Sequence, residues 1–192
     1  MQILEKKNPN IEKLYANIQK QFPQSEIKEK SVFEKIIKTS GCKIYNILYE
    51  DKICGFFTFC ELNNKTILID YFAINKEFHS MGLGTKTFEK IKSDLPYNGC
   101  YLEVEHPNPS EINTIRRIKF YENLGAKEIK IPYIYPNENG GLPMKLYFMP
   151  FKNNNYIPTI EQTKKNIHLA FEKLHFDIHN KDEIHNKIFA SI

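Results

Sequence analysis

The sequence is poor in features that would assign it to a membrane, an oxidising compartment or a nucleic acid. It has no apolar run long enough to span a bilayer, and Met1–Lys7 contains no apolar leader segment. Its cysteines form no C-x-x-C pair, and no basic block or RNA-binding aromatic signature appears. We therefore expect a cytoplasmic protein with no membrane or nucleic-acid partner.

Cysteine is scarce, and each of the four cysteines falls in a predicted strand. In a reducing cytoplasm, such residues are usually buried free thiols. We expect this state for all of them: Cys42, Cys54, Cys60 and Cys100.

The chain has 192 residues, of which 41% are hydrophobic and 26% charged, which is enough for one packed domain. The net charge of +4 is mild and suits an acidic cofactor. Apolar periodicity predicts mixed α and β structure. Strands are expected near Ile3-Leu4 and over Cys42–Tyr49, Ile53–Glu61, Lys65–Ile74, Cys100–Glu105, Lys127–Tyr133 and Met144–Met149. Helices are expected over Ile11–Phe22 and Ser25–Lys38, after the turn at Gly82, and around Arg116.

The most informative segment runs from Phe72 to Thr85. A β-branched and aromatic run enters a turn with two glycines, Gly82 and Gly84, and a helical pattern starts at once. This arrangement aims backbone N–H groups and the positive end of a helix dipole at one point. The segment therefore predicts a site for a phosphate or pyrophosphate.

The spacing of the glycines separates three classes of ligand. A Walker loop needs Lys directly after its last glycine, but Thr85 stands there. A dinucleotide fingerprint needs a third glycine where Thr87 stands. The third class is the acyl-CoA turn, R/Q-x-x-G-x-G/A, which His79–Gly84 matches except that His79 replaces Arg or Gln.

A second segment, Arg116–Ala126, forms an amphipathic helical pattern that ends at Gly125. With Tyr71–Glu89 as the first signature, the chain resembles the GNAT superfamily of N-acetyltransferases over about residues 1–150. The resemblance implies an α/β fold with a mixed, mostly antiparallel sheet of about seven strands flanked by helices. We expect a GNAT-like domain over residues 1–151 and a helical C-terminal extension over 152–192.

The resemblance also implies acetyl-CoA as the cofactor. The pantetheine arm would pair with the backbone of Phe72 and Ile74, and the pyrophosphate would lie on N–H groups from Met81 to Thr85. The expected cofactor-binding residues are Phe72, Ala73, Ile74, His79, Met81, Gly82, Leu83, Gly84 and Thr85.

Acetyl transfer to an amine needs a group that accepts a proton, because a lysine-type amine has a pKa near 10.4. Leu102-Glu103-Val104 resembles the strand that carries the base in some family members, so Glu103 is the first candidate. Glu105, Asp70 and a water relay remain alternatives. The resemblance places Tyr121 beside the CoA sulfur, as a general acid or as a hydrogen-bond donor to the departing sulfur.

The sequence predicts direct attack of a small-molecule or peptide amine within a ternary complex. Cys100 could serve as an acyl carrier, but no activating His stands near it in the sequence, and a buried position in a strand is the preferred interpretation. The loops at His106–Glu111, Tyr133–Pro136 and Gly140-Gly141 are expected to select the acceptor. The alternative function is a non-catalytic CoA-binding sensor or partner-binding module.

The segment after Lys152 departs from the family pattern. Asn153–Asn155 and Pro158 indicate a hinge, and helical patterns follow around Ile160–Leu174 and Asp182–Ala190. His175 and His179 could both reach a metal, but no third ligand is evident, so we expect no metal site. The extension is expected to pack on the core, to close over the site or to form a homodimer contact.

Overall fold

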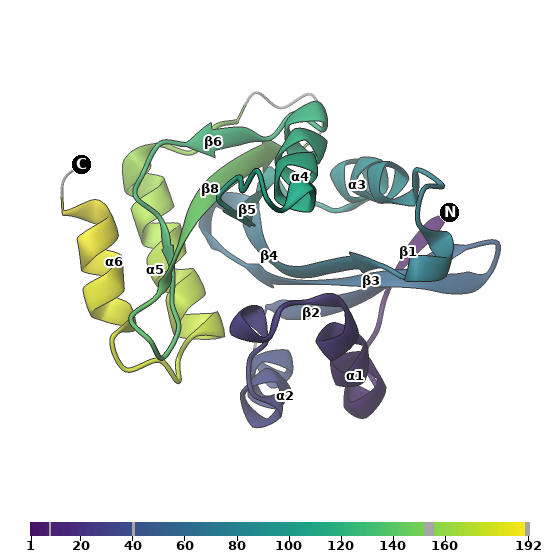
Figure 1. The fold of residues 1–192 in the computed structure, drawn as a ribbon, viewed down its shortest axis with the longest axis horizontal. Helices are drawn as coiled ribbons and strands as arrows, with labels where there is room; N and C mark the ends of the chain where they lie inside the picture. The colour runs from purple at the N-terminus through teal and green to yellow at the C-terminus, as the bar shows by residue number, and fades with distance from the viewer. Residues whose placement is uncertain (8, 40, 152–155, 191–192) are drawn as a thin grey trace.

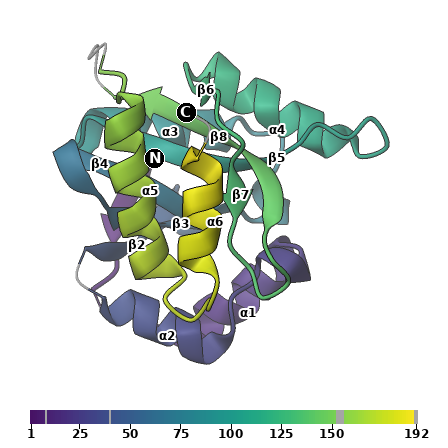
Figure 2. The same cartoon turned by 90° about the vertical axis from the view of Figure 1, so that its left-hand side faces the viewer.

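The computed structural model describes residues 1–7, 9–39, 41–151 and 156–190. Within these residues, an eight-stranded sheet has the order β1-β2-β3-β4-β5-β8-β6, with β7 paired to β8, and only the β4–β5 pair is parallel (Figures 1 and 2). The strands are β1 (Gln2–Glu5), β2 (Cys42–Tyr49), β3 (Lys52–Glu61), β4 (Thr66–Ile74), β5 (Gly99–Glu105), β6 (Lys127–Ile129), β7 (Ile134–Tyr135) and β8 (Leu142–Pro150). This confirms the predicted mixed and mostly antiparallel fold.

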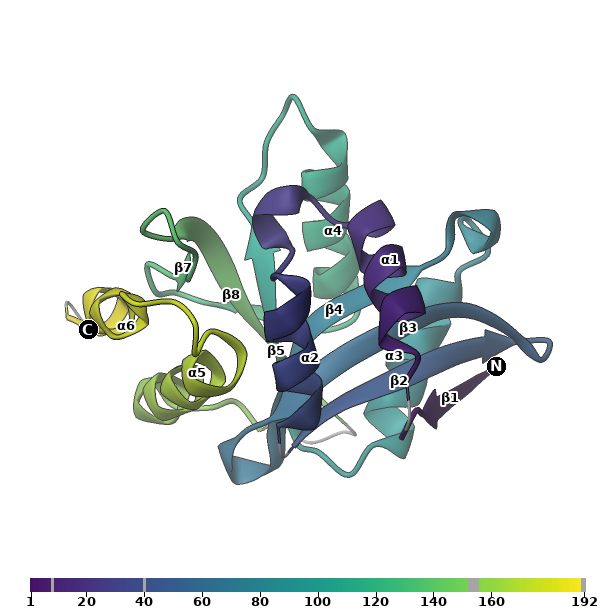
Figure 3. The same ribbon diagram turned by 90° about the horizontal axis from the view of Figure 1, so that it is seen from below.

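In the described part of the chain, six α-helices cover the sheet: α1 (Ile11–Gln21), α2 (Lys30–Lys38), α3 (Leu83–Asp94), α4 (Ile112–Asn123), α5 (Ile160–Leu174) and α6 (Lys181–Phe189). Helices α3 and α4 lie on one face, and α1 and α2 lie on the other (Figures 1 and 3). Within the described residues, each helix is too short or too polar to cross a bilayer.

The C-terminal helices α5 and α6 lie side by side next to β8 (Figure 2). Ile167 and Phe171 of α5 and Ile188 of α6 belong to one buried cluster with Val32 of α2 and Leu146 of β8. These two helices therefore share the face of the sheet that α2 covers. The hinge predicted at Asn153–Asn155 lies outside the described residues.

Two predicted elements differ from the structure. The strand expected over Lys127–Tyr133 ends at Ile129, and a separate short strand follows at Ile134, because Pro132 has no N–H group to donate to a neighbouring strand. The helix expected from Ser25 begins only at Lys30. The hydroxyls of Tyr15 and Tyr71 donate to the carbonyls of Lys28 and Glu26, and these tertiary hydrogen bonds hold the segment outside the helix.

The expectation of four free thiols is wrong for two of the cysteines. Cys42 of β2 lies directly opposite Cys60 of β3, and a disulfide joins them with their Cα atoms 4.1 Å apart. Cys54 and Cys100 are free and buried, as expected. The sequence placed both Cys42 and Cys60 in strands, but their pairing depends on the register between the strands, which the pattern of residues does not reveal.

Reduction of the Cys42–Cys60 disulfide should destabilise the protein. The bridge closes a loop with a sequence separation of 18 residues. A disulfide that closes a loop of this size raises the free energy of unfolding by about 3 kcal/mol. Urea unfolding with and without a thiol reductant should show this difference, and the Cys42→Ala/Cys60→Ala double variant should be insensitive to the reductant. Equal midpoints for the oxidised and reduced wild-type protein would contradict the assignment.

Candidate active site

The central strands β4 and β5 begin as a parallel pair and then separate. Their pairing ends at Ile69 opposite Leu102. Beyond this point β4 stays paired with β3 as far as Ile74, and β5 stays paired with β8 as far as Glu105. The last residues of the two strands therefore face each other without a shared hydrogen-bond ladder, which leaves backbone groups of β4 open to an added extended ligand.

A β-bulge in β4 places an acidic side chain at this point. Tyr71 pairs with Thr58 and Ile69 pairs with Phe59, so that Asp70 is an extra residue in the strand. A bulge changes the direction of the side chains that follow it. Asp70 consequently shares the α1–α2 face of the sheet with Tyr71, where it contacts Lys28.

A cavity of about 760 Å³ opens where β4 and β5 separate. Six of its lining residues are predicted site residues: Phe72, Ala73, Ile74, His79, Glu103 and Tyr121. The other predicted cofactor residues, Met81, Gly82, Leu83, Gly84 and Thr85, do not line this cavity but follow directly on Ser80, which does. The cavity is also lined by Glu26, Asp70, Glu105, Arg116 and Arg117.

The turn that enters α3 has the backbone shape expected of an anion site. Ser80 and Gly82 adopt left-handed conformations, with φ of 64° and 70°. A Cβ atom at Gly82 would meet no protein atom within 4 Å, so Gly82 is required by its φ and not by space. At Gly84 a Cβ atom would lie 3.3 Å from the ring of Phe120, a tight contact that would require the ring to shift by a few tenths of an ångström. The first N–H groups of α3, on Leu83, Gly84 and Thr85, have no acceptor within the helix.

His79 also contacts the end of β4. Its ring nitrogen Nε2 lies 2.8 Å from the carbonyl oxygen of Ile74. This carbonyl belongs to the strand edge that the sequence resemblance assigns to pantetheine. His79 thus joins the glycine turn to the open edge of β4.

Tyr121 lies on α4 on the opposite side of the sheet from Asp70. Its ring packs edge-on against Phe88 of α3, with the centroids 5.7 Å apart, and it also contacts Phe120. Its hydroxyl has no hydrogen-bond partner among the described residues. Burial raises the pKa of Tyr121 to about 12, so the phenol keeps its proton.

The three candidate carboxylates have different partners. Asp70 is buried and forms an ion pair with Lys28 at 2.7 Å, and Glu105 forms an ion pair with Arg117 at 2.6 Å. Glu103 forms no ion pair with any described residue and instead accepts a hydrogen bond from the hydroxyl of Tyr133. Glu103 is therefore the only one of the three that is not matched by a cation.

Burial raises the pKa of Glu103 to about 7. The hydrogen bond from Tyr133 and the charge of Lys28 lower it, whereas Asp70 and Glu26 raise it further. A carboxyl group with this pKa exchanges a proton near neutral pH, which is the property that a general base or acid requires.

Lys28 was not anticipated from the sequence, and it is central to this face of the site. Its ammonium contacts Asp70 and lies 3.3 Å from the hydroxyl of Tyr135. Although burial disfavours the ammonium, the charge of Asp70 holds the pKa of Lys28 well above its usual value. No local signal distinguishes Lys28 from the many other lysines of the chain, because its role arises from contacts with β4 and β7.

Of the loops predicted to select the acceptor, the one at Tyr133–Pro136 contacts residues of the site. Tyr133 and Tyr135 contact Glu103 and Lys28, respectively. His175 and His179 do not form a metal centre: His175 is buried against the ring of Tyr135, whereas His179 is exposed. The described residues contain no group of three or more His, Cys, Asp or Glu side chains that could hold a metal ion.

Solved structures with a similar fold are acetyltransferases. One is titled "Putative acetyltransferase from GNAT family" from Bacteroides thetaiotaomicron; it has a TM-score of 0.75 and 21% identity, and the match covers 93% of this chain and 99% of the other. Another is an aminoglycoside 6'-N-acetyltransferase complexed with coenzyme A, with a TM-score of 0.56, 16% identity, and coverage of 83% and 100%. These likenesses define the class of fold.

The family follows from the sequence. The model of the acetyltransferase (GNAT) family matches residues 11–126, and the chain belongs to this family. It is also 26% identical, over 161 residues, to the Bacillus subtilis protein named "Putative acetyltransferase YjbC", covering 80% of each chain. The family uses acetyl-CoA as its acetyl donor.

Proposed function

We propose that this chain is an acetyl-CoA-dependent N-acetyltransferase that transfers the acetyl group directly to a primary amine. The observation that carries the proposal is the cavity that opens where β4 and β5 separate. It is lined both by the open edge of β4 and by Glu103, the one of the three candidate carboxylates that forms no ion pair among the described residues. A thioester that enters along β4 would meet an amine that enters from the side of Glu103.

In this proposal, the turn and the edge of β4 hold the cofactor. The pyrophosphate lies on the N–H groups of Leu83, Gly84 and Thr85, where the dipole of α3 favours negative charge. Backbone groups of Phe72 and Ile74 bind the pantetheine arm. Because these contacts come from the backbone, they do not require the usual Arg or Gln. The carbonyl oxygen of Ile74 already contacts Nε2 of His79, and it has a second lone pair for the arm.

Glu103 accepts the proton that the amine loses as its nitrogen attacks the thioester carbon. A neutral alkylamine is rare at pH 7, by about three pH units or roughly 4 kcal/mol. A carboxylate with a pKa of about 7 is a stronger base than an ordinary one, and it is half ionised at pH 7 and mostly ionised above that. The choice of Glu103 as the base is supported by the ion pairs of the two alternatives, since Asp70 and Glu105 are each already paired with a cation.

The hydroxyl of Tyr121 donates a hydrogen bond to the sulfur as the thiolate leaves. Thiols have a pKa near 8.5, so complete proton transfer from a phenol with a pKa of about 12 is unfavourable. A hydrogen bond stabilises the developing charge without that cost.

Direct attack is also supported by the state of Cys100. This thiol is fully buried, and burial raises its pKa above the usual value. A buried neutral thiol is a poor nucleophile, which disfavours an acyl-cysteine intermediate. The expected cytoplasmic location and homodimer contact stay predictions within this proposal.

The overall function is tested with the purified protein by calorimetry and by release of CoA. Acetyl-CoA should give a heat of binding, and at least one member of a panel of amines should release CoA. The panel should include polyamines, amino acids, aminoglycosides and peptides with a free N-terminus. Binding without turnover by any amine would favour a non-catalytic CoA sensor, and no heat at high micromolar CoA would refute the proposal.

Replacement of Tyr121 by Phe should lower kcat about ten-fold or more, because the sulfur loses its hydrogen-bond donor. The affinity for CoA should stay nearly unchanged, since the ring still packs on Phe88. Steady-state kinetics and calorimetry measure the two quantities separately. An unchanged kcat would remove Tyr121 from the mechanism.

Replacement of Glu103 by Gln should lower kcat by about 10²–10⁴-fold. In the wild-type enzyme, kcat should rise with pH through about 7, because Glu103 must be ionised to act as a base. The kcat–pH profile of the Glu103→Gln variant should lack this rise. Glu128→Gln is the matched control: Glu128 forms ion pairs with Lys130 and Lys145 and does not line the cavity, so this variant should retain the wild-type profile.

Stability provides an independent check on the same variant. Because burial raises the pKa of Glu103, the folded protein binds a proton more tightly than the unfolded chain between pH values of about 4.5 and 7. The stability contributed by this group is present below that range and lost above it. Glu103→Gln should therefore be at least as stable as wild type at pH 8, and a large loss of stability there would contradict the burial of an ionised carboxylate.

A further inference from the structure

Tyr133 makes an unusual contact with the proposed base. It lies in the connection between β6 and β7, the residue is 1% exposed, and its hydroxyl donates to Oε1 of Glu103. Its own carbonyl accepts a hydrogen bond of 3.0 Å from the N–H of Met144, which ties the segment to β8. Both the ring and the backbone of Tyr133 are therefore held in place.

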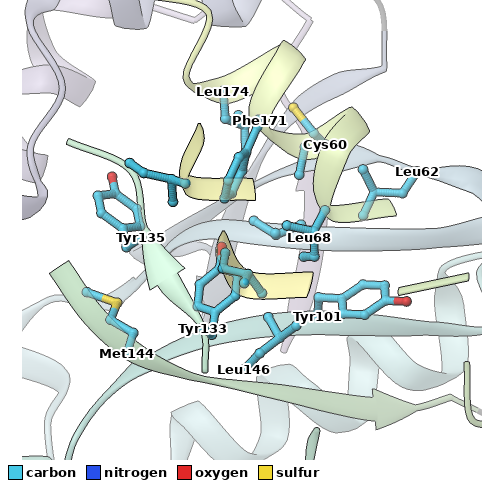
Figure 4. Packing of buried hydrophobic residues seen from close by; sticks show 14 of the residues in the cluster. Cys60, Leu62, Leu68, Tyr101, Tyr133, Tyr135, Met144, Leu146, Phe171 and Leu174 are labelled. Atoms are coloured by element: carbon cyan, nitrogen blue, oxygen red, sulfur yellow. The ribbon is translucent and has the colours of Figure 1, made fainter. Parts of the chain in front are cut away.

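The C-terminal helix α5 packs behind this tyrosine. Figure 4 shows Tyr133 in the buried cluster that also contains Leu146 and Phe171. The ring of Phe171 lies 6.4 Å from that of Tyr133, and His175 packs edge-on against Tyr135 at 4.8 Å. Tyr133 and α5 both lie outside residues 11–126, which the family model matches. The residue that contacts Glu103 and the helix that packs against it thus both lie outside the part of the chain that the family model matches.

The groups around Glu103 come from several elements. Tyr133 contacts it from the β6–β7 connection, Lys28 and Glu26 act on it from the connection between α1 and α2, and Asp70 acts from β4. On its own strand, Glu105 is paired with Arg117 of α4. Since Lys28 is itself paired with Asp70, their opposite charges partly cancel at Glu103. Tyr133 supplies the direct hydrogen bond.

The direction of this hydrogen bond follows from chemistry. Burial and the nearby Glu103 keep the pKa of Tyr133 well above its usual value, so the phenol is a donor at neutral pH. An ionised carboxylate can only accept hydrogen bonds. The contact therefore stabilises the ionised form of Glu103, and it engages Oε1 while leaving Oε2 available.

We propose that Tyr133 is a positioning residue for Glu103: it fixes the carboxylate at the cavity wall in the ionised state, with Oε2 free for the proton of the amine. This inference rests on the proposed function. Through Phe171, the packing of α5 holds Tyr133 in position and so makes the C-terminal segment part of the active-site structure.

The test is the variant Tyr133→Phe, which keeps the ring against Phe171 and removes only the hydroxyl. Without the donor, the acidic limb of the kcat–pH profile should move up by about one pH unit, since a hydrogen bond to a charged group stabilises that charge. On the acidic limb, kcat should therefore fall about ten-fold, and above pH 9 it should approach the wild-type value. An unmoved limb would overturn the proposal.

Tyr101→Phe is the matched control. Tyr101 is also fully buried, but its hydroxyl accepts a hydrogen bond from Asn166 of α5 at 3.2 Å and has no contact with Glu103. The control variant should lose stability without moving the limb. An equal shift in both variants would show that Tyr133 acts only through general packing, and it would overturn the proposal.

A measurement on the free protein separates this inference from the proposed function. Titration of the side-chain carboxyl carbon of Glu103 by NMR, assigned by the signal that Glu103→Gln loses, needs neither cofactor nor acceptor. The midpoint should be higher in Tyr133→Phe than in wild type. If no amine were acetylated, the proposed function would fail while this shift could still be observed. Equal midpoints would refute the role of Tyr133 even if the enzyme were active.

Discussion

The loss of pairing between β4 and β5 is the constraint on which the site depends. A parallel pair inside an otherwise antiparallel sheet is held only over Thr66–Ile69, after which each strand follows its other neighbour. A sheet normally satisfies its backbone groups internally, so strands that separate in the middle of a sheet leave groups for a ligand. Here the opening also connects the face that carries Tyr121 with the face that carries Glu103. The side proposed for the cofactor and the side proposed for the acceptor are thereby joined by one cavity.

Electrostatic pairing then differentiates the acidic residues around that opening. Asp70, Glu103 and Glu105 are chemically similar, but two of them are matched by Lys28 and Arg117. The third, Glu103, has no cation against it in the part of the chain that the structure describes: burial raises its pKa to about 7, although the hydrogen bond from Tyr133 acts in the opposite direction. A buried carboxyl without a cation exchanges a proton near neutrality. The roles of these residues are therefore set by their partners more than by their identity.

The helices after residue 156 contribute to this arrangement. Asn166 of α5 donates to the hydroxyls of Thr66 and Tyr101, at the start of the same two strands that later separate. Phe171 and His175 pack against the tyrosines that contact Glu103 and Lys28. A segment that departs from the family pattern in sequence is thus packed into the structure of the site.

The sequence by itself determined the features that depend on local periodicity and turn chemistry. It predicted the strands and helices with small errors at Ser25 and Tyr133, the glycine turn at Gly82, and the helix that carries Tyr121. Such features are encoded within a few consecutive residues, because backbone conformation and the alternation of buried positions are local. The position of Glu103 on its strand belongs to the same category.

Only the tertiary structure decided which distant residues meet. The register of β2 against β3 joins Cys42 to Cys60, and the bulge at Asp70 turns its carboxylate toward Lys28. Tyr133 reaches Glu103 across 30 positions of sequence. A shift of one residue in register moves a side chain to the other face of a sheet, so these partners depend on the packing of the whole fold and not on any local pattern.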